Sequence, residues 1–221
     1  MSELIFKKEK DADAYYVAGA GMFNKNATEI FIPAEYKGKP VTRIADEAFS
    51  GMKGLVSVTV ADGVTAIGNS AFKYCGNLKT VKLPDSITFI GSSAFAACYR
   101  LSNINLPKNL TEIKSRTFEL CLELNYKVDI PHGVTSIGYN AFLCCNNIRS
   151  VSLPSTLTHI EESAFEPQTV YKRGSKIEVF YWGNERDRAL IDIEKGNDDL
   201  ISGEWTYNTD YMLYSNKEKD V

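Results

Sequence analysis

The chain has 221 residues, of which 44% are hydrophobic and 24% charged, and its 25 basic and 28 acidic residues give a net charge of −3. These values are typical of one soluble globular domain or two small ones, and they exclude an intrinsically disordered chain. The nearly balanced charge excludes the strong positive field of nucleic-acid-binding proteins, and no apolar run approaches the roughly 18 residues of a membrane span. We therefore expect neither a nucleic-acid partner nor membrane insertion.

Residues 1–28 are predicted to form an N-terminal cap. The segment Tyr15-Tyr16-Val17 favours a strand or a hairpin. A cap is expected here because a stack of repeats exposes its core at each end unless a polar-faced element covers it. The charged start, MSELIFKKEK, lacks the apolar core of a signal peptide.

Residues 29–165 consist of six repeating units, each marked by one phenylalanine. The spacings between these phenylalanines are 23, 23, 23, 24 and 23 residues, and the six are Phe49, Phe72, Phe95, Phe118, Phe142 and Phe165. An isoleucine stands five residues before each phenylalanine, and another aliphatic residue stands three before that. The longer spacing comes from one residue inserted between Leu124 and Val128. A fixed period of this length indicates a solenoid.

Two patterns within each unit predict its local structure. Val81-Lys82-Leu83 alternates apolar and polar residues, which predicts a short strand with one buried face. Pro84 then ends the strand, because proline has no backbone donor. The segment of residues 92–98 has a small polar residue followed by helix-tolerant residues, which predicts a single helical turn. A unit this short cannot bury its own apolar face, so the units must stack into a right-handed coil whose strands form one parallel sheet.

The repeated motif L-x-x-V-x-L-P-x-x-(V/I/L)-T-x-I-G-x-x-A-F-x-x-C resembles the BspA-type leucine-rich repeat, strictly so over about residues 30 to 165. The resemblance implies an α/β leucine-rich-repeat solenoid, strand-dominated, with about six 23-residue repeats between terminal caps. Lys114 and Glu161 depart from the motif, which has glycine at that position in three units, as Gly68, Gly91 and Gly138. These departures loosen the turns of two units without threatening the fold.

Residues 166–214 resemble the degenerate terminal repeat that closes such arrays, and we predict that they form a C-terminal cap. Tyr181-Trp182-Gly183 and Trp205-x-Tyr207 carry this resemblance. Residues 215–221 are polar throughout and are predicted to be a frayed tail.

Four of the five cysteines stand three residues after the phenylalanine of their unit: Cys75, Cys98, Cys121 and Cys145. They are predicted to be buried thiols that act as small hydrophobic residues, because parallel side chains in a tight core seldom reach disulfide geometry. A zinc site is not expected, because its ligands have short spacings and converge from different directions. Cys144, two residues after Phe142, is expected to lie nearer the surface.

Enzyme chemistry has no visible place in the array, and we expect no catalytic residues, no cofactor and no metal. His132 and His159 occupy different columns of adjacent units, and neither stands beside an obvious nucleophile. The sequence also lacks the common nucleotide-binding, hydrolase and metalloprotease motifs. A remote alternative is a hydrolase that uses C-terminal carboxylates among aromatic residues, namely Asp192, Glu194, Asp198, Asp199 and Glu204.

The exposed face of the predicted sheet is the candidate binding surface. Its outward residues are predicted to be Phe31, Thr59, Lys82, Asn105, Asp129 and Ser152, with Phe31 and Phe89 as apolar anchors for a partner. Hydroxyls, amides and a few charges suit a protein or a glycan better than a phosphate backbone. Curved solenoids use such strand faces for extended binding.

We therefore predict a non-catalytic recognition scaffold for a protein or glycan, acting as a monomer rather than an oligomer. The resemblance implies a bacterial surface protein with an adhesin-like role. Because no signal peptide is visible, either the chain has been trimmed to its mature form or it is a cytoplasmic member of the family. A structural role, in which the caps join copies of the protein, is the alternative.

Overall fold

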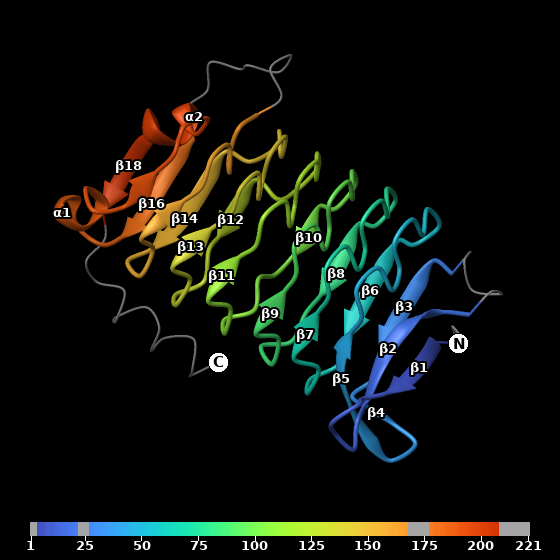
Figure 1. Ribbon diagram of the computed structural model, residues 1–221. Helices are drawn as coiled ribbons and strands as arrows, with labels where there is room; N and C mark the ends of the chain where they lie inside the picture. The colour runs from blue at the N-terminus through green and yellow to red at the C-terminus, as the bar shows by residue number, and fades with distance from the viewer. Residues whose placement is uncertain (1–3, 22–26, 168–176, 208–221) are drawn as a thin grey trace, which may run out of the picture.

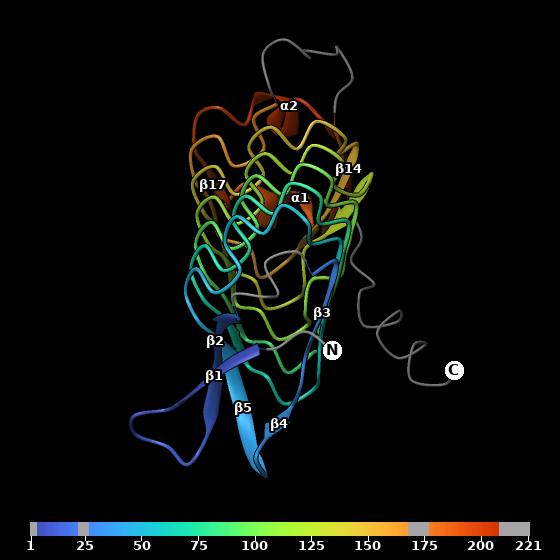
Figure 2. The same ribbon diagram turned by 90° about the vertical axis from the view of Figure 1, so that its right-hand side faces the viewer.

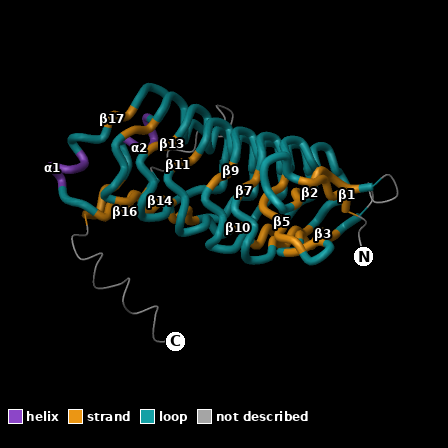
Figure 3. The backbone as a smooth tube through the Cα atoms, turned by 60° about the horizontal axis from the view of Figure 1, so that its bottom comes forward, coloured by secondary structure: helices purple, strands orange, loops and turns teal. Residues whose placement is uncertain are grey.

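The computed structural model describes residues 4–21, 27–167 and 177–207. Within these ranges the chain winds into an elongated stack of coils that runs from the N-terminal to the C-terminal end (Figure 1). Most of each coil is loop and turn, and the strands lie above one another from coil to coil (Figure 3). The structure thus has the strand-dominated solenoid fold that the sequence predicted.

One side of the stack carries the strands that the V-x-L pattern predicted. They pair in parallel in two groups, and in chain order they are β3 (Glu29–Ile32), β6 (Ser57–Val60), β8 (Thr80–Lys82) and β10 (Asn103–Ile104), then β12 (Lys127–Asp129), β14 (Ser150–Pro154), β16 (Glu178–Trp182) and β18 (Glu204–Tyr207). Residues at the same position of the repeat lie opposite one another in neighbouring strands; Val58, for example, lies opposite Val81. Alternate residues are buried, as the pleat of a strand requires.

The prediction of a single parallel sheet needs a correction, because each coil contributes a second strand on the opposite side, which after the first coil is only two residues long. These strands contain the isoleucine column, and they are β5 (Lys39–Ile44), β7 (Ala66–Ile67) and β9 (Phe89–Ile90), then β11 (Glu112–Ile113), β13 (Ser136–Ile137), β15 (His159–Ile160) and β17 (Asp192–Ile193). In Figure 2, β3 and β14 lie along one side of the stack and β2 and β17 along the other. The sequence did not reveal these strands because two residues are too few to show an alternation.

The predicted helical turn at residues 92–98 is wrong, because the segment forms consecutive turns. Ser93 and Ala97 have positive φ angles of 57° and 58°, which no helix accommodates. The backbone amides of this segment alternate between hydrogen bonds within the turn and hydrogen bonds to the next coil. The Ala96 amide donates to the Ser93 carbonyl at 3.1 Å, whereas the Phe95 amide donates to the Thr117 carbonyl of the next coil at 2.9 Å. The turns therefore form a third set of bonds between coils. The described helices are α1 (Glu185–Arg188) and α2 (Asp198–Ile201), both near the C-terminal end.

The core is a continuous column that runs through the whole stack. The six repeat phenylalanines stack on one another with ring centroids 5.0–5.7 Å apart. Each is at most 5% exposed, and the isoleucine and leucine columns are buried around them. Each ring therefore contacts the coils on both sides, so that burial in one coil depends on its neighbours.

The N-terminal end is closed by the hairpin that the sequence predicted around Tyr15–Val17. Strands β1 (Leu4–Lys8) and β2 (Tyr15–Ala20) are antiparallel, and β2 pairs in parallel with β5 of the first coil. A small additional strand, β4 (Glu35–Tyr36), folds back on β5. The ring of Tyr36 stacks on that of Phe6 at 4.0 Å, which seals this end of the core.

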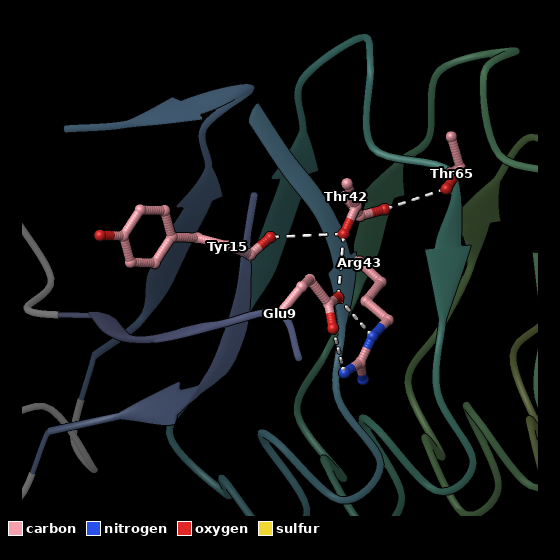
Figure 4. Close-up of polar contacts among 5 residues, drawn as sticks. All are labelled: Glu9, Tyr15, Thr42, Arg43 and Thr65. Atoms are coloured by element: carbon pink, nitrogen blue, oxygen red, sulfur yellow. Dashed lines mark hydrogen bonds and ion pairs between the residues drawn. The ribbon is translucent and has the colours of Figure 1, made fainter. Parts of the chain in front are cut away.

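Polar contacts fasten the hairpin to the first coil (Figure 4). The Arg43 guanidinium donates from Nε and Nη2 to the two carboxylate oxygens of Glu9 at 2.7 and 3.0 Å. The Thr42 hydroxyl donates to the same carboxylate and lies 3.3 Å from the Tyr15 carbonyl. The hydrogen bonds from Arg43 hold the pKa of the Glu9 carboxyl below its ordinary value.

The threonine at position 42 begins a column that has a structural role. The Thr65 hydroxyl donates to the carbonyl of Thr42 at 3.1 Å, as Figure 4 shows, and Thr88 donates in the same way to Thr65. The pattern resumes further along the stack, where Thr158 donates to Thr135 at 3.0 Å. These hydroxyls link successive coils and satisfy carbonyls beside the short strands.

Residues 177–207 continue the stack after the sixth unit. Strand β16 pairs with β14, β17 with β15, and β18 with β16, so the parallel pairing extends to the last described strand. Tyr181 is 1% exposed and meets the Trp205 ring edge-on at 6.0 Å, while the indole N–H of Trp205 donates to the Leu200 carbonyl. The predicted frayed tail, residues 215–221, lies outside the described residues.

Candidate functional site

The outward side chains of β3, β6, β8, β10, β12 and β14 form one surface, which we call the strand face. Of the seven residues that the sequence predicted for binding, five belong to these strands, and Asn105 directly follows β10. Phe31 lies opposite Thr59, Thr59 opposite Lys82, and Asp129 opposite Ser152. A second column of outward residues runs beside it: Glu29, Ser57, Thr80, Asn103, Lys127 and Ser150.

The two ends of this column differ in exposure. Phe31 is 59% exposed, which is unusual for a phenylalanine on a soluble surface, whereas Ser152 is only 4% exposed. Ser152 points outward, but the ammonium of Lys127 lies 5.8 Å from the Phe180 ring, and this contact passes from β12 to β16 over the intervening β14. Ser152 is therefore buried, whereas the sequence analysis placed it among the exposed residues of this face.

Phe89 does not belong to the strand face. It lies on β9, in the sheet on the opposite side of the stack, next to Ala66. Its ring is 39% exposed, and the Lys114 ammonium lies 5.8 Å from it. The two predicted aromatic anchors thus face opposite ways, because the sequence analysis did not recognise the second strand of each coil.

The strand face is interrupted by a cleft of about 480 Å³. Among the described residues, ladder pairing stops at β10 and resumes at β12, and the sheet on the other side stops at the same level, between β9 and β11. The residue inserted between Leu124 and Val128 lengthens the loop before β12 at this level. The lining combines polar side chains with two core rings: Asn103, Asn105, Asn125, Lys127, Asp129, Phe118 and Phe142.

The polar groups of this cleft are held in defined positions. The Asn105 side chain donates to the Leu83 carbonyl at 2.9 Å and accepts from the Leu83 amide at 3.4 Å, so it replaces a strand pairing that β10 is too short to make. Lys127 and Asp129 form an ion pair at 2.9 Å along the same strand. The cleft is the feature that sequence reasoning missed, although the 24-residue spacing between Phe118 and Phe142 marked its position.

The cysteine column lies in the core, as predicted. Cys75, Cys98, Cys121 and Cys145 are buried free thiols, and each donates to the phenylalanine carbonyl of the preceding coil at 3.1–3.3 Å. Burial raises the pKa of the Cys75 thiol to about 12 and that of the Cys121 thiol well above its ordinary value. Thiols with such pKa values are poor nucleophiles, because the thiolate is the reactive form. Cys144 is partly exposed, as expected.

The two histidines lie apart from each other. His132 is exposed in a loop, whereas His159 is half-buried on β15. The structure adds a contact that the sequence did not suggest: His159 Nδ1 lies 3.1 Å from Asp192 Oδ2, and its Nε2 lies 3.4 Å from Glu194 Oε1. Both carboxylates come from the next coil, so this cluster joins the sixth unit to the C-terminal segment.

The five C-terminal carboxylates are distributed over different elements. Asp192 lies on β17, Asp198 and Asp199 lie on α2, and Glu204 lies on β18 in the sheet on the other side. Over the described ranges, no group of three or more histidine, cysteine, aspartate or glutamate side chains could hold a metal ion. In the same ranges no helix is long and apolar enough to cross a membrane.

Comparison with known proteins identifies related sequences and folds. A family model for the BspA type leucine rich repeat region matches residues 21–131 with six copies. The leucine rich repeat protein of T. pallidum is 24% identical with a TM-score of 0.69, over 99% of this chain and 94% of that one. This similarity shows a shared fold.

Two further solved structures are more distant. The leucine-rich repeat protein from Bacteroides capillosus is 24% identical with a TM-score of 0.45, over 68% of this chain and 94% of that one. A leucine rich cell surface protein from Faecalibacterium prausnitzii is 15% identical with a TM-score of 0.43, over 86% and 96% of the two chains. No curated protein matches the chain.

Proposed function

This chain belongs to the BspA-type leucine-rich repeat family, and from this we infer that it is a non-catalytic recognition scaffold that binds a protein or a glycan through its strand face. Solenoids of this kind typically serve as binding scaffolds, because stacked repeats create extended surfaces. The chain uses no cofactor in this role, and binding is its biochemical activity.

The cleft between β10 and β12 is the observation that carries this proposal. It lies midway along the strand face, between the pairs β3–β6 and β14–β16. Amides, an ammonium and a carboxylate line it together with the rings of Phe118 and Phe142. Binding sites commonly combine such an apolar base with a few fixed polar groups that orient the ligand.

The chemistry of the surrounding surface indicates the class of partner. Thr59, Thr80 and Asn103 offer hydroxyl and amide groups, while Lys82 and Asp129 have opposite charges. Such a mixture matches the hydrogen-bonding groups of a polypeptide or a sugar chain. It gives no continuous positive surface for a phosphate backbone, which argues against nucleic acid as the partner.

We place this activity at the surface of a bacterial cell, where proteins of this family often occur, in an adhesin-like role without membrane insertion. The monomer is the proposed active form. The hairpin β1–β2 covers the N-terminal end of the core, and on the last described strand Glu204 stands beside Glu178. Charged side chains on an edge strand oppose pairing with a second copy.

A binding experiment with defined surfaces tests the proposal. Purified protein is applied to immobilised extracellular-matrix glycoprotein and to mucin, beside a triple variant, Phe31→Ala/Lys82→Ala/Asp129→Ala. Wild-type protein should bind at least one of these surfaces, and the variant should lose most of that binding. Light scattering on the same sample should give the mass of one chain.

A matched control replaces one phenylalanine, one lysine and one aspartate outside the strand face, Phe89→Ala/Lys195→Ala/Asp11→Ala. All three side chains are exposed, so the control should fold and bind as the wild type does. Equal loss in both variants would remove the strand face from the proposal. Binding of wild-type protein to neither surface would remove the adhesin-like role.

A further inference from the structure

A second cleft, of about 740 Å³, lies on the corner of the stack where each coil turns from its phenylalanine toward the next strand. It spans three consecutive coils and is lined by Lys53, Tyr74, Gly76, Asn77, Tyr99 and Arg100. None of these residues belongs to the strand face. The volume lies within the range of small-ligand sites in proteins.

Two tyrosine rings flank this cleft and remain open to solvent. The side chain of Tyr74 is 54% exposed and that of Tyr99 is 43% exposed. The Tyr99 ring lies over Gly76, where an added Cβ would stand 3.2 Å from Tyr99 Cδ2. Glycine at position 76 thus allows the ring to lie close against the backbone. The Tyr74 backbone is also fixed, because its amide donates to the Ala96 carbonyl at 2.9 Å.

The charged groups of the cleft are all positive. Lys53 and Arg100 line it, and no described residue forms an ion pair with either. The Lys73 ammonium lies 5.1 Å from the centre of the Tyr74 ring. Among the residues that the structure describes, no carboxylate lines the cleft. A ligand with a negative charge would therefore find two cations whose charge the described residues do not neutralise.

A fixed amide completes the set of polar groups. Asn77 Nδ2 donates to the Lys53 carbonyl at 2.7 Å, which orients the side chain and directs Oδ1 to accept a further hydrogen bond. The cleft therefore presents aromatic faces, cations and a positioned acceptor within one site.

We propose that this cleft binds a sugar that carries a carboxylate, as the terminal residue of an acidic glycan does. The C–H groups of a sugar ring pack on exposed aromatic faces, which supply apolar contact at low entropic cost. The carboxylate pairs with Lys53 and Arg100, and a sugar hydroxyl donates to Asn77. A neutral sugar would make the ring contacts but leave both cations unpaired. This site stands apart from the strand face and does not depend on the function proposed there.

Titration calorimetry with 3′-sialyllactose and with lactose tests the proposal, because the two probes differ by one carboxylate-bearing sugar. Sialyllactose should bind in a saturable manner and at least about tenfold more tightly than lactose. Raising the salt concentration should narrow this difference, because the cations and the bound carboxylate are exposed to solvent.

Two variants separate the contributions of the rings and the charges. Tyr74→Ala/Tyr99→Ala should abolish binding of sialyllactose, and Lys53→Gln/Arg100→Gln should bind both probes equally weakly. Tyr126→Ala is the matched control, because that side chain is 65% exposed and lies outside the cleft. The altered side chains are exposed, so the unfolding temperature of each variant should remain that of the wild type.

Four outcomes would overturn the proposal. They are equal affinity for the two probes, no binding of sialyllactose up to about 10 mM, unchanged binding by the tyrosine variant, or equal loss in Tyr126→Ala. The variant of Phe31, Lys82 and Asp129 should bind sialyllactose as the wild type does. Failure of the strand-face proposal and failure of this one are therefore distinguishable.

Discussion

The coils before the break at β10 and the coils after it share their core but differ at their surface. In both parts the phenylalanine rings stack at similar distances, from 5.2 Å between Phe49 and Phe72 to 5.0 Å between Phe142 and Phe165. Before the break, Thr59 and Lys82 remain accessible, whereas after it Ser152 is covered by the contact of Lys127 with Phe180. Inward residues thus specify the coil, and outward residues can vary without changing it.

The largest expected effect comes from removing one ring of the shared core. Phe95→Ala should lower the free energy of unfolding by about 3–5 kcal/mol, because it opens a cavity between two neighbouring coils. The ring is completely buried and stacks on Phe72 and Phe118. Lys82→Ala, on the strand face, should change the free energy of unfolding by less than about 0.5 kcal/mol. Urea unfolding measures both, and similar effects would mean that core and surface are wrongly assigned.

A substitution at the turn before the repeat phenylalanine probes how tightly adjacent coils approach. Gly91→Ala should cost about 1–3 kcal/mol, because the added Cβ would lie 2.6 Å from the Asn69 amide nitrogen and the coils would have to separate. Lys114 occupies the same place after the break and already carries a Cβ. Lys114→Ala should therefore be nearly neutral in thermal unfolding, and a large loss there would show that close approach of adjacent coils is not what requires glycine at position 91.

Deleting Asn125 should join the two groups of strands on the strand face into one sheet. The deletion restores the 23-residue spacing, so β12 should pair with β10 and close the cleft. Two new ladder hydrogen bonds would stabilise the protein by about 1–2 kcal/mol. Hydrogen exchange at the amides of residues 127–129 should slow, and binding through the strand face should weaken. Unchanged exchange would show that the inserted residue does not cause the break.

The ion pair at the N-terminal end makes a smaller and pH-dependent contribution. Hydrogen bonds from Arg43 lower the pKa of Glu9 below its ordinary value of 4.5. The stabilisation is therefore fully present above that ordinary value and is lost as the pH falls through the lowered one. Arg43→Met should cost about 0.5–1 kcal/mol at pH 7. Unfolding curves at several pH values should show that the difference in free energy of unfolding between Arg43→Met and the wild type disappears at strongly acidic pH. A difference that does not change with pH would exclude the Glu9–Arg43 ion pair as its cause.

Much of the fold could be predicted from sequence because its main determinants repeat. The phenylalanine, isoleucine and cysteine columns show the period directly, and a unit of 23 residues can bury them only by stacking. The turns at residues 92–98 were mistaken for a helix, because Ser93 and Ala97 tolerate either conformation and only the bonds to the next coil select the positive φ angles.

The candidate sites were less predictable because they depend on contacts between coils. Phe89 was assigned to the strand face because its two-residue strand shows no alternation in the sequence. The covering of Ser152 requires Lys127 and Phe180 to meet across the strand between them, and no local pattern encodes that contact. The 24-residue spacing indicated an irregular loop, but the resulting cleft depends on how two whole sheets end at the same level.

The buried thiols have a consequence for the media in which the fold persists. Each of the four sulfur atoms is held against a carbonyl of the preceding coil, and burial raises the pKa of every one of them. Disulfide exchange requires a thiolate with access to its target. Once stacked, the coils therefore protect these sulfur atoms from cross-linking. Once formed, the same fold should therefore persist in both a reducing and an oxidising medium.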